Sequence, residues 1–126
     1  MRLQRTSLLT NLLLFHGILA APLAWSAQLV FGYGIGEARC SPFGSRYGVD
    51  SQFGELVLLL VTAGVALSAL VVAGLLFFAE RRESGVDDRG RVAFMAGGGV
   101  LVSSIFIVLI LLGGIASLSI SHCQQG

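Results

Sequence analysis

Charged side chains are scarce in this chain of 126 residues. Only 12% of the residues are charged, 55% are hydrophobic, and the mean hydropathy is +0.85, whereas about 25% charged residues is usual for soluble domains. A soluble domain of this size could not bury so much apolar surface. The composition also excludes a disordered tail and a nucleic-acid binder. The chain is therefore expected to be an integral membrane protein.

Lysine is absent, and cysteine occurs only twice. Two cysteines exclude a disulfide-dense secreted scaffold, and neither lies in a CxxC or zinc-type spacing. The sequence also lacks a phosphate loop, HExxH and GxSxG motifs, and paired carboxylates within the apolar stretches. We therefore expect no catalytic residues, no resident metal and no cofactor.

Three apolar stretches are long enough to cross a bilayer, whose hydrocarbon core of ~30 Å requires about 20 helical residues. Because backbone polar groups cannot stay unpaired in lipid, each stretch is predicted to be a helix. The helices are expected at about 8–33, 56–78 and 92–118, joined by an outer loop at 34–53 and a cytoplasmic loop at 80–90. This pattern predicts an all-α membrane protein, with residues 1–126 forming one bundle of three transmembrane helices.

The first stretch has a second interpretation. Its basic start, apolar middle and small-residue end at Trp25-Ser26-Ala27 resemble a cleavable signal peptide, whose removal would leave two helices. Apolar residues continue through Leu29, Val30 and Phe31, which gives a full-length span. An uncleaved first helix is therefore the favoured prediction.

The arginines predict the orientation, because cytoplasmic loops near transmembrane helices carry an excess of Lys and Arg. Six arginines precede the first span or lie between the second and third, and two lie between the first and second. The two groups are Arg2, Arg5, Arg81, Arg82, Arg89 and Arg91, and Arg39 and Arg46. The N-terminus is therefore predicted to be cytoplasmic and the C-terminus periplasmic or extracellular.

Small residues at intervals of three or four positions form a stripe on one face of each predicted helix. Such faces let membrane helices approach closely. The stripes are Gly17, Ala21, Ala24, Gln28 and Gly32; Glu55, Thr62, Ala66, Ala69 and Ala73; and Ala96, Gly99, Ser103, Phe106, Gly114 and Ser117. Leu12, Leu19, Leu23 and Val30 lie opposite the first stripe and are expected to face lipid. Pro22 lacks the N–H that would bond to the Ile18 carbonyl, so it predicts a kink that serves either shape or a hinge.

A few polar residues of the spans are candidate site residues. Gln28 is predicted to form an interhelical hydrogen bond, and Ser103 is predicted to be a polar residue of a helix-packing face. Glu55 is expected at the outer mouth of the second helix, either solvated or turned inward toward Gln28 or Tyr33. Tyr33 and Trp25 are typical of packing and of the aromatic belt at the interface. His16 could bond to another helix or ligate haem, but it has no second ligand at matching depth.

The two cysteines predict a disulfide. Cys40 follows the first helix and Cys123 follows the third, so both fall on the outer, oxidising side. The Cys40–Cys123 bond would tie the first helix to the C-terminal tail. The alternative is a copper site formed by Cys40, His122 and Cys123, because thiolate and imidazole ligands suit copper(I).

The string Ala21-Pro22-Leu23-Ala24-Trp25-Ser26-Ala27-Gln28-Leu29, followed by Tyr33 and Cys40, resembles a known family. The family consists of small three-helix bacterial membrane proteins with a G-P-x-A-W-x-x-H-L…Y…C pattern, associated with haem–copper terminal oxidases. Further matching positions are Arg91, Phe94, Gly97, Ser103, Phe106 and Cys123. Ala21 replaces a glycine of the pattern. Gln28 stands where the pattern has histidine, which counts against metal binding or proton relay there.

The resemblance implies a non-catalytic accessory or assembly subunit of a respiratory or other energy-transducing complex in the bacterial inner membrane. Its small-residue helix faces would pack against other membrane subunits, so a hetero-oligomer is expected. The alternative is a homo-oligomeric transporter or permeability protein with Gln28, Glu55 and Ser103 along a shared pathway. A weaker alternative is an outer-face copper-handling protein.

Overall fold

Three long helices make up the part of the chain that the computed structural model describes, residues 2–41, 51–82 and 89–119. They are α1 (Arg2–Cys40), α3 (Ser51–Arg82) and α4 (Arg89–Ser119). Each contains a segment long and apolar enough to cross a membrane: Ser7–Ala38, Gln52–Arg82 and Gly90–Ser119. The all-helical fold with three candidate membrane spans is confirmed, and the orientation of its ends stays a prediction.

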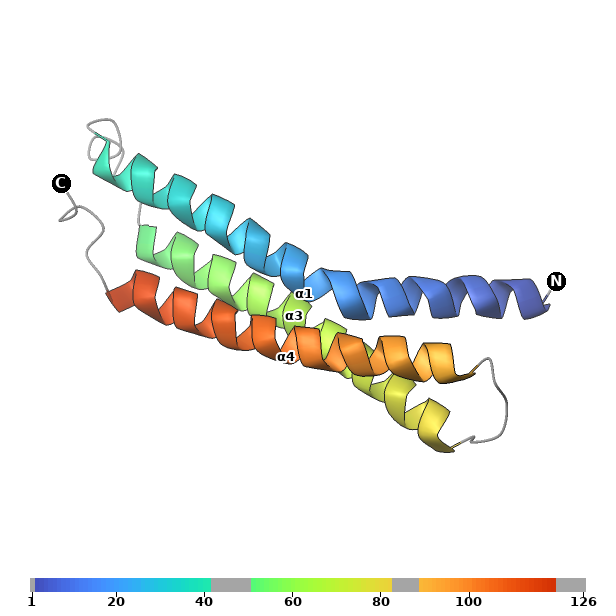
Figure 1. The fold of residues 1–126 in the computed structure, drawn as a ribbon. Helices are drawn as coiled ribbons and strands as arrows, with labels where there is room; N and C mark the ends of the chain where they lie inside the picture. Colours follow the sequence, from blue (N-terminus) through green and yellow to red (C-terminus); the bar gives the residue numbers. More distant parts are fainter. Residues whose placement is uncertain (1, 42–50, 83–88, 120–126) are drawn as a thin grey trace.

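The helices run alternately up and down the bundle (Figure 1). The start of α1 lies at the same end as the end of α3 and the start of α4, and the other three helix ends lie at the opposite end. α1 continues through Pro22 as a single helix and changes direction in its middle part. A bend there agrees with the predicted kink, because the proline ring removes one backbone hydrogen bond and displaces the preceding turn.

The helices are longer than their apolar stretches. Residues 34–40, expected in the outer loop, continue α1, while residues 51–55 belong to α3 and 80–82 end it. Two hydrogen bonds stabilise the extra turns of α1. The Tyr33 hydroxyl hydrogen-bonds to Glu37 one turn later, and the Ser41 amide donates to the Glu37 carbonyl over 3.1 Å. Apolarity marks only the part of a helix that meets hydrocarbon, so it does not show where the helix ends.

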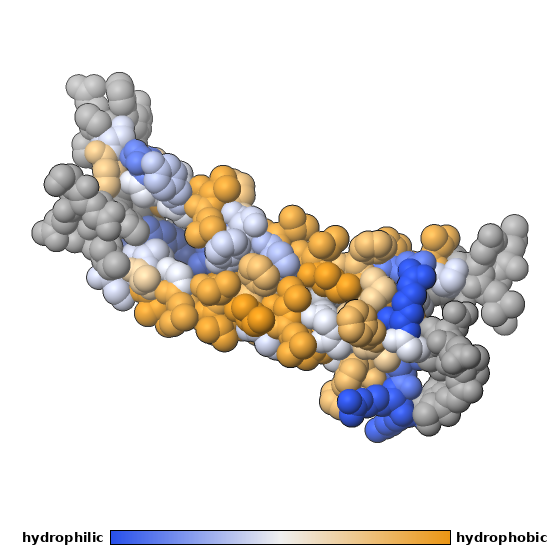
Figure 2. Space-filling model, viewed as in Figure 1, coloured by the Kyte–Doolittle hydropathy of each residue, from blue (hydrophilic) through white to orange (hydrophobic). Residues whose placement is uncertain are grey.

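Small residues form the interior of the bundle, and large apolar residues form its surface. Ala21 and Ala24 of α1 pack with Ala66 and Ala69 of α3 and Ile110 of α4. The predicted lipid-facing row of α1 is exposed, with Leu12, Leu19, Leu23 and Val30 all at least 48% accessible. Apolar residues cover the middle of the visible face, as Figure 2 shows. In lipid this distribution is favourable, because apolar side chains suit the lipid-facing surface and small residues let the helix backbones approach closely in the interior.

All three helices meet where glycine replaces larger side chains. A Cβ atom at Gly99 of α4 would lie 3.0 Å from the Gly17 carbonyl oxygen and 3.1 Å from the Ala73 Cβ. The Ser103 hydroxyl, which is fully buried, donates to the same Gly17 carbonyl over 3.1 Å. Any side chain at Gly99 would therefore push on the backbone of α1. This contact fixes the distance between the three helices.

Candidate functional site

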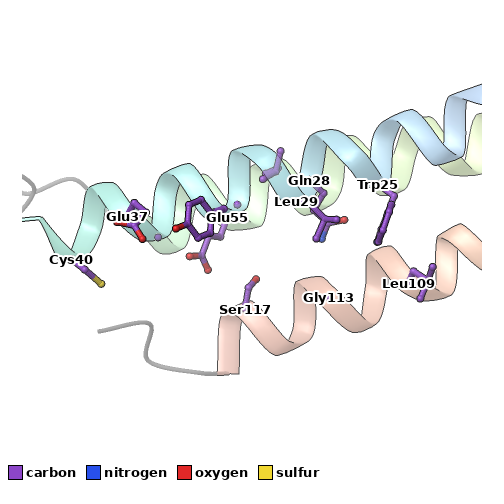
Figure 3. Close-up of a pocket in the computed structure, with 13 residues that line it drawn as sticks. Trp25, Gln28, Leu29, Glu37, Cys40, Glu55, Leu109, Gly113 and Ser117 are labelled. Atoms are coloured by element: carbon purple, nitrogen blue, oxygen red, sulfur yellow. The ribbon is translucent and has the colours of Figure 1, made fainter. Parts of the chain in front are cut away.

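A cavity of about 860 Å³ lies between α1, α3 and α4, in the half of the bundle that contains Cys40. Its volume falls within the range typical of ligand sites, roughly 300–1,000 Å³. From α1 it is lined by residues three or four positions apart, namely Trp25, Gln28, Gly32, Gly36 and Cys40, which therefore share one helix face. We call this space the outer cavity. Figure 3 shows Trp25, Gln28 and Glu55 directed into the space facing α4.

The outer cavity is open because several residues of its walls are glycines, which have no side chain. Gly32 and Gly36 line it from α1, and Gly113 lines it from α4. A Cβ atom at Gly32 or Gly36 would meet nothing within 4 Å, and one at Gly113 would meet only the Gln28 side chain at 3.9 Å. Interiors normally fill to high density, because each void forfeits dispersion contacts. The glycines thus keep open a space that ordinary side chains could fill.

Gln28 forms the interhelical hydrogen bond expected from its position. Its Nε2 donates to the Ile110 carbonyl of α4 over 3.1 Å. Its Oε1 atom is buried and has no hydrogen-bond partner among the described residues. A buried acceptor without a donor costs roughly 1–3 kcal/mol. Gln28 therefore brings an unsatisfied acceptor to the wall of the outer cavity.

Glu55 turns inward, in agreement with the second of the two positions predicted for it. The side chain is only 5% exposed, so it is not a solvated boundary residue. It lines the same cavity as Gln28, Tyr33 and Glu37. Its position close to the first turn of α3 places this carboxylate between the helices rather than in the loop. Ionisable side chains so placed in a membrane protein are functional candidates.

Tyr33 does not pack between helices, contrary to one part of the prediction, while its place in the aromatic belt stays a prediction. Its side chain is 73% exposed, and its hydroxyl bonds to Glu37 on its own helix. The helix α1 continues beyond residue 33, which explains the difference. Tyr33 therefore lies within the helix, where it lines the outer cavity, and not in the last turn. The aromatic ring therefore contributes a surface to the cavity.

The predicted shared pathway of Gln28, Glu55 and Ser103 is only partly assembled. Gln28 and Glu55 line the outer cavity, but Ser103 does not. Ser103 is fully buried at the crossing of the helices, where its hydroxyl is bound to the Gly17 carbonyl. Ser103 therefore lies on a packing face, as predicted, and its hydrogen bond to another helix is a finding of the structure.

A second polar feature was not predicted in full. His16 of α1 lies 3.1 Å, Nε2 to Oγ, from Ser68 of α3, and both side chains are exposed on the surface of the bundle. A bond from His16 to another helix was one of the two roles that the sequence indicated, but no sequence feature singled out Ser68. A serine is common in apolar helices, and only the relative rotation of α1 and α3 brings the two together.

The sequence did not indicate several residues of the outer cavity, among them Glu37, Gly36, Gly113 and Leu109. The helical spacing from Trp25 to Cys40 was a signal that could have indicated one face. The face is recognisable only if residues 34–40 are helical, whereas their composition predicts a loop. Trp25 does pack as predicted, with its ring edge-to-face against Phe106 and the centroids 5.5 Å apart.

The metal and disulfide predictions depend on residues beyond the described ones. Cys40 lies at the end of α1, and no described cysteine is a free thiol. His122 and Cys123 lie outside the described residues, so the Cys40–Cys123 disulfide and the alternative copper site stay predictions. Within residues 2–41, 51–82 and 89–119, no three His, Cys, Asp or Glu side chains cluster as metal ligands would, and this range includes His16.

Comparison with known proteins gives no relative: no family model, no curated protein and no solved structure matches the chain.

Proposed function

We propose that the protein is a non-catalytic accessory subunit of a larger membrane complex in the bacterial inner membrane. The resemblance of the Ala21–Leu29 string favours a complex of the respiratory or energy-transducing class. The observation that carries the proposal is the exposed His16–Ser68 pair.

The depth of the pair is what makes its exposure informative. Ser68 lies midway along the apolar stretch of α3, between Glu55 and Glu80. At 1.5 Å per helical residue, it is about 19 Å from either end. Polar and ionisable side chains at this depth almost always face the interior of a bundle or a water-filled cavity. Here both side chains are exposed on the isolated chain, so a further protein surface would cover them in an assembly.

The hydrogen bonds of the pair indicate what a partner would offer. The Ser68 hydroxyl donates its only hydrogen to the Val65 carbonyl over 2.7 Å, so the His16 ring donates Nε2–H to Ser68 Oγ. A neutral imidazole then carries its acceptor lone pair on Nδ1. Gly64, one turn before Ser68, is exposed, and a Cβ there would meet nothing within 4 Å. A partner helix with a hydroxyl or amide donor suits this surface, because the small residues allow close approach.

The small-residue stripes no longer support this partnership, contrary to our expectation from the sequence. Ala21, Ala66, Ala69, Ala73 and Ala96 are all buried between the three helices of the chain itself. A partner cannot contact helix faces that are already buried within the bundle. We therefore place the proposed partner contact on the surface that α1 and α3 form at His16 and Ser68.

Purification in a mild detergent tests the proposal. We expect the protein to recover other membrane subunits in fixed stoichiometry, with a reduced-minus-oxidised haem spectrum if the partner is a terminal oxidase. His16→Ala and Ser68→Ala should release the partner. Ser104→Ala is the matched control, because Ser104 is also exposed but bonds only to its own helix, at the Val100 carbonyl.

Two results would refute the proposal. Recovery of a lone monomer, or of a homo-oligomer by native mass spectrometry, would remove the partner; the homo-oligomer would favour the alternative of a transporter. Retention of the partner by both His16→Ala and Ser68→Ala would show that the pair is not the contact.

A further inference from the structure

The outer cavity has the length of one leaflet of a membrane. Trp25, at its inner end, lies near the middle of the membrane span Ser7–Ala38, and Glu37 lies near the end of that span. Residues 25 to 37 rise about 18 Å along the helix, which is close to half of the ~30 Å hydrocarbon core. We propose that the outer cavity holds one acyl chain of a phospholipid from that leaflet. This site is separate from the proposed partner surface and does not depend on it.

The polarity of the cavity wall changes along its length in the same direction on all three helices. Each helix contributes an apolar residue near the inner end and a polar residue toward the end near Cys40. The apolar residues are Trp25, Leu58 and Leu109, and the polar ones are Glu37, Glu55 and Ser117. Figure 3 shows Trp25 and Leu109 toward one end of the space and Glu37 and Ser117 toward the other. A phospholipid has the same gradient, with an apolar chain below a polar ester and headgroup.

The cavity is open to the side of the bundle. Leu29, Tyr33 and Leu109 line it, and all three are also exposed on the surface. They lie within the membrane spans Ser7–Ala38 and Gly90–Ser119, so in a bilayer their exposed sides adjoin lipid. An acyl chain can therefore enter the cavity from the surrounding membrane without leaving an apolar environment.

An empty cavity would destabilise the bundle, because a void costs free energy in proportion to its volume. Water does not suit the inner part, since Leu58 and Leu109 offer it no hydrogen-bond partners. An acyl chain would restore dispersion contacts along the wall. Gly32 and Gly36 leave room for it, because a Cβ atom at either position would meet nothing within 4 Å.

The polar side chain deep in the cavity wall does not oppose an acyl chain. Gln28 Nε2 is already bound to the Ile110 carbonyl over 3.1 Å, and Gln28 Oε1 is itself buried by the protein. The amide therefore presents little polar surface to the cavity. A chain that lies against Gln28 displaces no hydrogen bond of the bundle.

Trp25 can report whether an acyl chain reaches the inner end. It is the only tryptophan of the protein, and its ring packs against Phe106 of α4, which joins the two helices at this end of the cavity. Bromine atoms on an acyl chain quench tryptophan fluorescence on contact. The full protein in dodecyl maltoside micelles is therefore titrated with phosphatidylcholine in which one acyl chain is dibrominated.

Occupation of a site and contact with surrounding lipid give different titration curves. If the cavity binds the chain, quenching of Trp25 saturates at a low content of brominated lipid, and an excess of unbrominated phosphatidylcholine reverses it. Lipid that only surrounds the bundle gives quenching that rises in proportion to the brominated lipid. We expect the saturable curve.

Two glycine substitutions locate the site. Gly32→Leu places a side chain between Trp25 and the end near Cys40, and should abolish the saturable quenching. Gly34→Leu is the matched control, because it makes the same change two residues away, at an exposed position that is not among the described residues of the wall and where a Cβ also meets nothing within 4 Å. The fluorescence of each variant is expressed relative to its own value in unbrominated lipid.

Equal quenching curves for Gly32→Leu and Gly34→Leu would show that only surrounding lipid reaches Trp25, and would overturn the proposal. Quenching of the unsubstituted protein that does not saturate, or that unbrominated phosphatidylcholine does not reverse, would do the same. If Gly32→Leu fails to fold, as shown by gel filtration, Gly36→Leu fills the same cavity nearer to Cys40 and is compared with the same control.

Discussion

Replacing Gly99 by alanine should destabilise the bundle at the point where its three helices meet. The new methyl group would lie 3.0 Å from the Gly17 carbonyl oxygen and 3.1 Å from the Ala73 Cβ. Neither neighbour is the end of a flexible side chain, so the helices themselves must separate. Overpacking of this kind costs typically about 1–3 kcal/mol. The separation also lengthens the Ser103–Gly17 hydrogen bond, which is worth about 0.6 kcal/mol in a membrane bundle.

The neighbouring glycine provides the control. Gly98→Ala makes the same chemical change one residue earlier, where a Cβ meets nothing within 4 Å. Both variants gain the same helix propensity, about 1 kcal/mol for alanine over glycine. The difference between them therefore isolates the contact, and we expect Gly99→Ala to be less stable than Gly98→Ala by about 1–3 kcal/mol.

Unfolding by increasing SDS in mixed micelles measures this difference, because the helices persist while their packing is lost. Trp25 is the only tryptophan of the chain, and its ring packs against Phe106, so its fluorescence reports the transition. Equal stability of the two variants, or greater stability of Gly99→Ala, would refute the close approach of the three helices.

Three further predictions concern single features. Gln28→Leu removes a hydrogen bond worth about 0.6 kcal/mol, but it also removes a buried acceptor without a donor, which costs about 1–3 kcal/mol. Stability in the same SDS assay should therefore stay the same or rise, and a loss above about 1 kcal/mol would contradict this. Non-reducing mass spectrometry should find Cys40 joined to Cys123, and two alkylatable thiols in protein from oxidising conditions would disprove the bond. Alkaline phosphatase fused between Cys40 and Ser51 should be active and between Arg82 and Arg89 inactive, and the reverse result would invert the predicted orientation.

The core of the bundle was predictable because small residues recur at helical intervals. Ala66, Ala69 and Ala73 share a face whatever their neighbours are, and in lipid that face must be covered by another helix. The same regularity predicted the exposed leucine row of α1. Helix ends were less predictable, because residues 34–40 are helical without being apolar.

The candidate sites depend on how the helices are placed against one another. Glu55 is buried only because α3 presents it to the space between the helices, and the outer cavity is open only because α1 and α4 carry glycines where side chains would meet. The His16–Ser68 pair joins residues distant in sequence, so no local pattern indicates it.

The sequence by itself thus determined three membrane helices, the face each one buries and the lipid-facing row of the first, because hydropathy and helical periodicity are properties of a single helix. Only the tertiary structure decided where the helices approach within contact at Gly99, where they leave the outer cavity, and which polar side chains meet. The physical reason is that the distance and rotation between helices are set jointly by side chains from all three.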